Sequence, residues 1–476
     1  MHIKSPFLAG FNRLLGGRKP ASAVGKLLAL RRVMDVLCCT QLTSLFGAFL
    51  PSDLLASQYP MPGGSRDRIY TRAVTFWAFL GQVLSPGTTC RGAVASIQAL
   101  LALNGLKCSK DTSAYCEARL RLSVRWLMAI HDHITQRLML GHGEEGRLLV
   151  GDGTTATLQD TPALQKRYPQ PKAQKPGCGF PIMKLLGIFD LRSGAWLATT
   201  HSSRKFHDCR LWRRLFWRLL RGDTIIVDRA FCSWVDLARL AARGIDVVVR
   251  LHQMRSADFR KGKRLGKDDH LVDWLKPQRP KWMSQREYDT LPAFITVREV
   301  RRCFENRGMR TTELIVVTTL LNLKKHSANE VAALYARRWT VELYFDDLKT
   351  TMHMEMLRTK SPEMVCRELL MHMIAYNLLR AVMVRAEISP EKASFKGTVD
   401  RLETWSWAIW LAPTQQTAIE RTNEMLESIA SDKVPYRPGR QEPRACKRRP
   451  KPHALLNSPR HSMKVNAHRS KCRKAA

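Results

Sequence analysis

Acidic residues are scarce in this chain of 476 residues. It has 41 Asp and Glu against 78 Lys and Arg, which gives a formal net charge of +37. An excess of this size goes far beyond what solubility requires, and it favours a polyanionic partner, above all nucleic acid. A role at a membrane surface is the weaker alternative, because no basic amphipathic helix is recognisable as an anchor.

Long apolar runs and paired cysteine motifs are also missing. No run of about 18 uncharged apolar residues exists, so we expect no transmembrane helix. The N-terminal residues contain no apolar core followed by a small-residue cleavage site, and a signal peptide is not expected. The 12 cysteines form no C-x-x-C pair and no Cys/His cluster. This usage is typical of reduced thiols in a cytosol.

The N-terminal third of the chain predicts helices. Segments 71–84 and 90–103 carry apolar residues at three- and four-residue steps. A third helix is expected over 111–138, with Asp111 or Ser113 as its N-cap. These helices form either a plain bundle or a DNA-binding module, and the positive charge of the chain favours the second.

From residue 146 the pattern changes to an α/β order. Strands are expected over 147–152, 181–191, 195–201, 224–228 and 245–251, and helices over 208–220 and 233–244. The first and fourth strands end in Asp152 and Asp228, at the edge where α/β folds place ligand-binding groups. This order of elements matches a ribonuclease-H-like core. There the first and fourth strands are neighbours, so the two aspartates are expected side by side.

A helix is predicted over 335–349, which has no proline or glycine, and Ser327 and Glu330 before it are spaced like a capping box. On an ideal helical wheel, one phenol, two cations and one carboxylate share a stripe about 60° wide. These residues are Tyr335, Arg338, Glu342 and Lys349. Such a stripe is usually a solvated face with i,i+4 pairs. This helix is also rich in Leu, Trp, Tyr and Phe, however, and a carboxylate between cations on a half-buried helix suits a metal ion that meets phosphate.

The acids Asp152, Asp228 and Glu342 are therefore candidates for one site. Taken singly, an aspartate after a strand is more often a turn or cap residue. Two strand-end acids, a helix acid with basic neighbours and the large positive charge together favour a shared site. Clustered carboxylates repel one another unless cations neutralise them, and hard oxygen ligands suit Mg²⁺ or Mn²⁺. Two such ions about 4 Å apart activate an attacking oxygen and stabilise a leaving oxygen at phosphorus.

The spacing Y-(2)-R-(3)-E-(6)-K of the four helix residues resembles the signature of the insertion-sequence-four family of DDE transposases. GDGTTATLQDTPALQKRYPQP, QKPGCGFP and VDRAF, around the two aspartates, look like segments of the same family. TTCRGAV and DTSAYCEAR in the N-terminal helices resemble it too. The resemblance covers residues from about 72 to 380.

The resemblance implies a DNA transposase. Such an enzyme binds the ends of its mobile element, cleaves them with a metal-activated water and joins the 3′-hydroxyl ends to target DNA by cut-and-paste. The catalytic, metal-binding triad carries over to Asp152, Asp228 and Glu342. The contacts to phosphates of the element end carry over to Tyr335, Arg338 and Lys349. Two ions of Mg²⁺ or Mn²⁺, double-stranded DNA of the element ends and the target, a homodimer, no membrane, and the bacterial cytoplasm or nucleoid are implied with them.

The expected organisation is an α/β chain with a ribonuclease-H-like catalytic core, a β-rich insertion, a helical N-terminal domain and a basic tail. Its segments are the DNA-binding helical domain (1–145), the first part of the core (146–251), the insertion (252–325), the catalytic helix with the closing helices (326–386), a C-terminal helical region (387–432) and the tail (433–476). The tail holds fourteen Lys and Arg against one acid, with several prolines. Such a composition cannot bury a core, and we expect it to be disordered in isolation.

Two rival functions remain open. A metal-dependent DNA nuclease would use the same core chemistry and cut without joining. A transposase-derived protein that has lost activity would bind DNA only, although such a protein has no physical need for all three acids.

Overall fold

The computed structural model describes residues 45–47, 49–50, 55, 69–85, 87, 89–102, 107–140, 146–303 and 313–435. Apart from its first three residues, the predicted basic tail falls outside the described residues, so its expected disorder stays a prediction. Within the described ranges, no helix is both long enough and apolar enough to cross a membrane.

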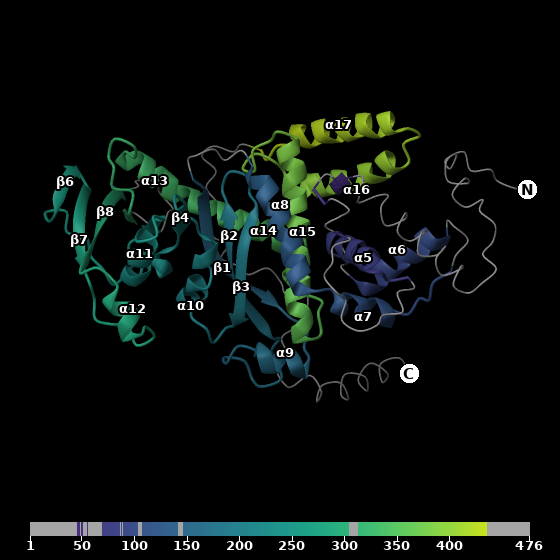
Figure 1. Ribbon diagram of the computed structural model, residues 1–476, viewed down its shortest axis with the longest axis horizontal. Coiled ribbons are helices and arrows are strands. Elements are labelled where there is room, and N and C mark those ends of the chain that lie inside the picture. The colour runs from purple at the N-terminus through teal and green to yellow at the C-terminus, as the bar shows by residue number, and fades with distance from the viewer. Residues whose placement is uncertain are drawn as a thin grey trace, which may run out of the picture.

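A nine-stranded sheet forms the centre of the molecule, in the order β3-β2-β1-β4-β5-β9-β8-β7-β6 (Figure 1). The strands are β1 (Leu148–Thr157), β2 (Ile182–Asp190), β3 (Trp196–Ser203), β4 (Thr224–Val227), β5 (Asp246–Arg250), β6 (Lys263–Gly266), β7 (Asp269–Leu275), β8 (Phe294–Cys303) and β9 (Glu313–Thr318). β1 pairs with β4, and β4 with β5, in parallel. The other neighbours in the sheet pair antiparallel. β1 and β4 are thus adjacent, as the order of elements predicted.

The parallel strands are covered on both faces. Val150 and Ile226 pack in one hydrophobic core, and Leu149 and Ile225 pack in the other, because successive side chains of a strand point to opposite faces. The covering helices are α14 (Thr340–Asp346) and α15 (Pro362–Arg385) on the first face, and α10 (Asp208–Arg213) and α11 (Trp234–Ala241) on the second. Burial on both faces explains why these strands are continuous apolar runs in the sequence.

The segment predicted as an insertion extends the same sheet. β9 pairs with β5, and β8, β7 and β6 follow outward from it. The prediction of a β-rich segment over 252–325 rested on runs at 292–304 and 311–321, which are confirmed as β8 and β9, whereas β6 and β7 were missed. β7 carries two buried polar residues: Arg298 of β8 donates two hydrogen bonds to Asp269 at 2.8 and 2.6 Å, and His270 Nε2 lies 2.9 Å from Glu299. These pairs satisfy buried polar groups but interrupt the apolar alternation by which a strand is recognised.

Most of the remaining helices lie beyond the β3 edge of the sheet, and one lies on the side of β7 and β8 (Figure 1). They are α5 (Arg72–Leu84), α6 (Cys90–Ala102), α7 (Ser113–Arg121), α8 (Val124–Met139), α9 (Pro162–Arg167), α12 (Gln285–Asp289), α16 (Phe395–Trp410) and α17 (Gln415–Ser431). The prediction of a single helix across α7 and α8 is wrong. The helix is interrupted between them, and Ser123 caps α8 by accepting a hydrogen bond from the Trp126 N–H. The N-cap of α7 is Thr112, not Asp111 or Ser113.

Two further helix predictions fared differently. A closing helix was predicted within 326–386, and it is confirmed as α15. The helix predicted over 208–220 is shorter, because α10 stops early and a 3₁₀ turn follows it. Trp212, Phe216 and Leu219 are all buried, so the helical spacing of apolar residues persists although the backbone tightens.

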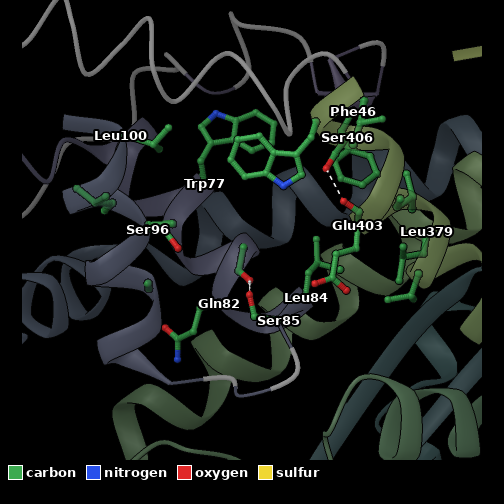
Figure 2. A pocket seen from close by; sticks show the side chains of 18 of the residues that line it. Phe46, Trp77, Gln82, Leu84, Ser85, Ser96, Leu100, Leu379, Glu403 and Ser406 are labelled. Atoms are coloured by element: carbon green, nitrogen blue, oxygen red, sulfur yellow. Dashed lines mark hydrogen bonds between the residues drawn. The ribbon is translucent and has the colours of Figure 1, made fainter. Parts of the chain in front are cut away.

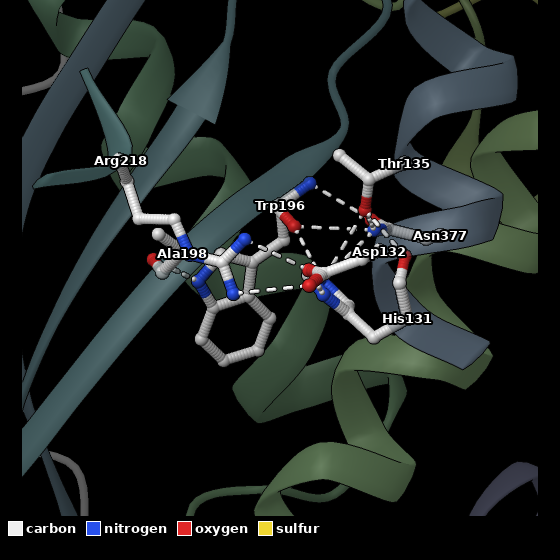
Figure 3. A network of polar contacts seen from close by, with 7 residues as sticks. All are labelled: His131, Asp132, Thr135, Trp196, Ala198, Arg218 and Asn377. Carbon is white, nitrogen blue, oxygen red and sulfur yellow. Dashed lines mark hydrogen bonds and ion pairs between the residues drawn. The ribbon is translucent and has the colours of Figure 1, made fainter. Parts of the chain in front are cut away.

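A buried polar network holds α8 and α15 on the edge strand β3 (Figure 3). The Asn377 amide takes the place of a neighbouring strand: its Oδ1 accepts from the Trp196 N–H at 2.8 Å, and its Nδ2 donates to the Trp196 carbonyl at 3.1 Å. His131 Nε2 lies 2.8 Å from the same carbonyl. At the rim, Asp132 pairs with Arg218 at 3.0 Å.

Replacing Asn377 with Leu is expected to lower the free energy of unfolding by about 3 kcal/mol, because both backbone groups of Trp196 would lose this partner in the core. The urea midpoint, followed by tryptophan fluorescence, measures the change. Gln416→Ala, which removes an exposed amide on α17, serves as the control and should shift the midpoint little. An Asn377→Leu midpoint equal to that of the control would contradict this role.

α15 also buries a histidine that has no carboxylate partner. Burial lowers the pKa of His372 from 6.5 to about 3, and the nearby His353 adds to this effect. The folded state therefore keeps His372 neutral, while the unfolded chain takes up a proton as the pH falls below 6.5. The contribution of neutral His372 to the free energy of unfolding is fully present above pH 6.5 and is lost as the pH falls. Between pH 7 and pH 5 this loss lowers the free energy of unfolding by roughly 2 kcal/mol.

His372→Leu should remove this contribution to the pH dependence. We expect the loss of stability between pH 7 and pH 5 to shrink by roughly 2 kcal/mol relative to wild type. Urea unfolding at both pH values measures it, with His326→Leu as a control on a partly exposed histidine. Equal pH dependence in wild type and His372→Leu would rule out the contribution.

The N-terminal helices reach the C-terminal helices across a mostly apolar cavity of about 260 Å³. Figure 2 shows Trp77 of α5 and Leu379 of α15 among its lining residues, with Glu403 and Ser406 from α16. The packing of α5 on α16 is therefore incomplete, whereas α5 and α7 contact α15 directly.

Candidate active site

Two of the predicted acids start from adjacent strands. The parallel pairing of β1 with β4 ends at Gly151 and Val227, and Asp152 and Asp228 are the next residues. The prediction that Asp152 ends its strand is wrong, because β1 continues to Thr157 through its pairing with β2. β4 stops one residue before Asp228, and Asp152 is the first residue of β1 beyond its pairing with β4. Both aspartates therefore lie at the C-terminal end of the parallel pairing.

The third acid comes from a helical run whose winding changes. α13 (Ala328–Ala336) begins with the predicted capping box of Ser327 and Glu330, which is confirmed. A 3₁₀ turn (Arg337–Trp339), α14 and a π turn (Asp347–Thr351) follow without a break. A 3₁₀ turn is wound more tightly than an α-helix and a π turn more loosely. The uniform helix predicted over this stretch is therefore wrong in its winding, although α14 places Glu342 against β1.

Arg338 joins the acids. Its Nη1 donates to Asp152 Oδ2 at 3.0 Å, and its Nη2 donates to Glu342 Oε1 at 3.1 Å. The charge of Asp228 acts on the same guanidinium. Only 7% of Arg338 is exposed, against 51% of the Glu342 side chain. The arginine is thus held in the protein, while the glutamate faces the solvent and is free to reach a ligand.

The surroundings of Asp152 disfavour its charged form. Burial raises its pKa to about 6, and the charges of Asp228 and Glu342 add to this. The Gly153 N–H, 2.7 Å from Asp152 Oδ1, and the Arg338 charge oppose the rise. A carboxylate in this state binds a cation readily, because a cation relieves both the burial of charge and the repulsion between acids.

The site residues fit a divalent cation by their chemistry. In the described part of the chain, no three His, Cys, Asp or Glu side chains converge as a metal cluster, because Arg338 lies between Asp152 and Glu342. The donor set is nonetheless all hard oxygen, and its charges repel one another. Arg338 supplies the positive charge that these acids require. A metal ion bound there would compete with Arg338 for Asp152 and Glu342.

The comparisons with known proteins point to one family. A family model described as "Transposase DDE domain" matches residues 143–378. The chain is 26% identical over 362 residues to "Transposase InsG for insertion sequence element IS4" of Escherichia coli (strain K12). The alignment covers 71% of this chain and 77% of that protein.

The chain belongs to the DDE transposases of the IS4 type. A solved structure, the cryo-EM structure of piggyBac transposase in a synaptic complex with hairpin DNA, aligns with 84% of each chain at 10% identity. Its TM-score of 0.41 is too low for that likeness to bear on the fold or the function. The family match and the relative identify a DNA transposase by themselves.

In this transposase the phenol of the signature is buried. Tyr335 is 6% exposed, and burial raises its pKa to about 12, with a further contribution from the Asp228 charge. The charges of Arg338 and Arg250 oppose the rise. Tyr335 therefore stays protonated at neutral pH and offers an O–H donor.

Arg250 is the residue of the transposase site that sequence reasoning missed. It is the last residue of β5, and β5 is the neighbour of β4. Its charge acts on Tyr335, beside Asp228. The signal was present in the sequence: the strand predicted over 245–251 carries a charged residue, Arg250, next to its C-terminal end.

Lys349 lies apart from the other signature residues. It is on the π turn, and burial lowers its pKa while the charges of Glu355 and Asp346 raise it. Asp346 accepts a hydrogen bond from Thr350 at 2.7 Å. The structure thus brings Tyr335 and Glu342 to the two aspartates, and it places Lys349 about two helical turns beyond Glu342.

Proposed function

We propose that this transposase binds the ends of its own mobile element, cleaves them by phosphodiester hydrolysis and joins the resulting 3′-hydroxyl ends to target DNA by cut-and-paste. The observation that supports the proposal is that Arg338 donates hydrogen bonds to both Asp152 and Glu342, while the charge of Asp228 acts on the same guanidinium. The strand order β3-β2-β1-β4-β5, with β2 antiparallel to β1, supports a ribonuclease-H-like core.

In this proposal Asp152, Asp228 and Glu342 hold Mg²⁺ or Mn²⁺, as two ions. When bound, such ions supply an activated attacking oxygen and neutralise the leaving oxygen. The chain itself positions the DNA. Arg338 can form two parallel hydrogen bonds to a phosphate, and its burial keeps the guanidinium in one orientation.

Three further residues contact phosphates in the same proposal. Tyr335 donates its O–H, and Arg250 and Lys349 supply positive charge on either side of the acids. Such contacts set the register of the strand on the protein and carry no sequence information themselves. Sequence recognition is assigned to the helical domain, residues 1–145.

The proposed partners are double-stranded DNA of the element ends and of the target. Two ends must be joined together, so we propose a homodimer in which each copy acts on one end. The bacterial cytoplasm or nucleoid is the expected location. The division into a split catalytic core (146–251 and 326–386), an insertion (252–325), a helical region (387–432) and a tail (433–476) belongs to the same proposal.

The test is a cleavage and joining assay. Purified protein and Mg²⁺ are mixed with linear DNA carrying the gene's own flanks and with a supercoiled plasmid as target. The proposal expects cuts at the element ends and products joined into the plasmid. Sequencing of the junctions shows whether the 3′ ends of the element were transferred.

The rival functions give different products. A nuclease cuts the flanks and yields no joined molecules. A transposase-derived DNA-binding protein shifts the DNA in a gel and cuts it with neither Mg²⁺ nor Mn²⁺. Either outcome would replace the proposed function.

A further inference from the structure

The connection between β1 and β2 is rich in cations and contains one acid, Asp160. Residues 161–180, here called the cationic loop, include α9 and lie beyond the C-terminal end of β1 (Figure 1). Its cations are all exposed: Lys166, Arg167, Lys172 and Lys175. Surface lysines usually do no more than keep a protein in solution. A segment with four cations against one acid, however, also attracts a polyanion.

The cationic loop is ordered by one glutamine. Gln170 uses its full hydrogen-bonding capacity: Oε1 accepts from the N–H groups of Gly177 and Gly179, both at 3.1 Å, and Nε2 donates to the carbonyls of Gln174 and Lys175 at 3.1 and 2.8 Å. Gly177 has a φ of +76°, a conformation that favours glycine. The exposed lysines are thus presented on a backbone that is already arranged, which lowers the entropy lost on binding.

The cationic loop is joined to the segment that follows the π turn of the catalytic helix. The Leu357 N–H donates to the Thr157 carbonyl at 3.0 Å, and the Thr161 hydroxyl donates to the Lys360 carbonyl at 3.0 Å. Arg358 and Lys360 are exposed there. The cations of this segment are therefore held beside the start of the cationic loop, with one exposed acid, Glu355, in the same segment.

The reach of the cationic loop follows from β1. The strand continues five residues from Asp152 to Thr157, which is about 17 Å at ~3.3 Å per residue. Successive phosphates of one DNA strand are ~3.4 Å apart along the axis, so β1 ends about five base pairs from Asp152 and the loop follows beyond that point.

We propose that the cationic loop binds the phosphate backbone of the element-end duplex, about five or more base pairs from the scissile phosphate. The hydrogen bonds that join the loop to the segment after the signature helix assign it to the same duplex whose strand lies at the acids, and the inference therefore rests on the proposed function. The interaction holds the duplex in register for the cut and reads no bases.

The experiment measures the affinity of the full chain for element-end duplexes whose two arms are shortened in turn, over a range of salt. For long DNA, a double variant, Lys172→Gln with Lys175→Gln, is expected to bind about tenfold more weakly, and log K against log salt should flatten by about 1.8. For duplexes whose arm on one side is shorter than about four base pairs, it should bind like the wild type.

A matched control removes the same charge elsewhere. The control is the double variant Lys392→Gln with Lys396→Gln. Both lysines follow the C-terminal end of α15, a helix of 24 residues that is about 36 Å long. The control should show no dependence on arm length. Gln170→Met keeps every charge and removes the four hydrogen bonds, and it should weaken binding of long DNA by about threefold or more if the arrangement of the loop matters.

The outcomes separate the two levels of the proposal. Wild-type affinity in the double lysine variant, or an equal loss at all arm lengths, overturns the role of the cationic loop while cleavage by the wild type leaves the proposed function intact. A wild-type protein that neither prefers nor cuts element-end DNA overturns both.

Discussion

Glu342→Gln is expected to reduce DNA cleavage by at least about 1000-fold, which corresponds to roughly 4 kcal/mol of transition-state stabilisation. The change removes the negative charge that a divalent cation requires and keeps the shape of the side chain. Because half of the Glu342 side chain is exposed, stability should change by less than about 1 kcal/mol. DNA affinity should stay within about threefold, since the phosphate contacts remain. Single-turnover cleavage of labelled element-end DNA measures the rate.

Asp346→Asn is the matched control. It removes one carboxylate charge from the same helix, one turn beyond Glu342. Asp346 bonds to Thr350 and acts on Lys349, and it contributes nothing to the acids in this account. The variant should cut within about threefold of the wild-type rate. Cleavage by Glu342→Gln at the rate of this control would remove Glu342 from the site.

Arg338→Gln is expected to lower the rate of DNA cleavage by about 100-fold. A loss of this size is typical when an enzyme loses one fixed hydrogen-bond donor to the charge that develops in the transition state. The variant also has a distinctive dependence on pH. Arg338 holds the pKa of Asp152 down, so its removal raises a pKa that is already about 6. More Asp152 is then protonated at pH 7, and raising the pH should restore part of the activity. A pH–rate profile in Mg²⁺ measures the shift.

The neighbouring arginine provides the control for this experiment. Arg337 pairs with Glu391 at 2.8 Å, outside the acid site. Arg337→Gln removes the same charge one residue away and should leave both the rate and the pH profile close to wild type. A pH profile of Arg338→Gln that is lowered uniformly, with no recovery at high pH, would show that Arg338 acts only on DNA and not on Asp152.

The neighbourhood of Asp152 and Asp228 could be predicted because it depends on the order of elements. Each strand is an apolar run, and the connections between them allow only a few arrangements. The capping box of Ser327 and Glu330 could be predicted because it depends on residues three apart. Local patterns and short connections of this kind are visible in a sequence.

Other features depend on partners that are distant in sequence. β7 was missed because Asp269 and His270 are buried against Arg298 and Glu299, which lie about thirty residues later. The tight and loose turns around α14 follow from packing, and a helical wheel assumes uniform winding. The bridge made by Arg338 joins residues 186 apart on one side and four apart on the other. Only the pair with Glu342 could have been anticipated from the sequence.

The central claim is that Asp152, Asp228 and Glu342 form one metal site. Its most direct test is the affinity for Mn²⁺ of the wild type and of Asp152→Asn, Asp228→Asn and Glu342→Gln, measured by electron paramagnetic resonance with element-end DNA present. The account predicts that each substitution weakens Mn²⁺ binding at least about tenfold. Unchanged Mn²⁺ affinity in all three variants would contradict it.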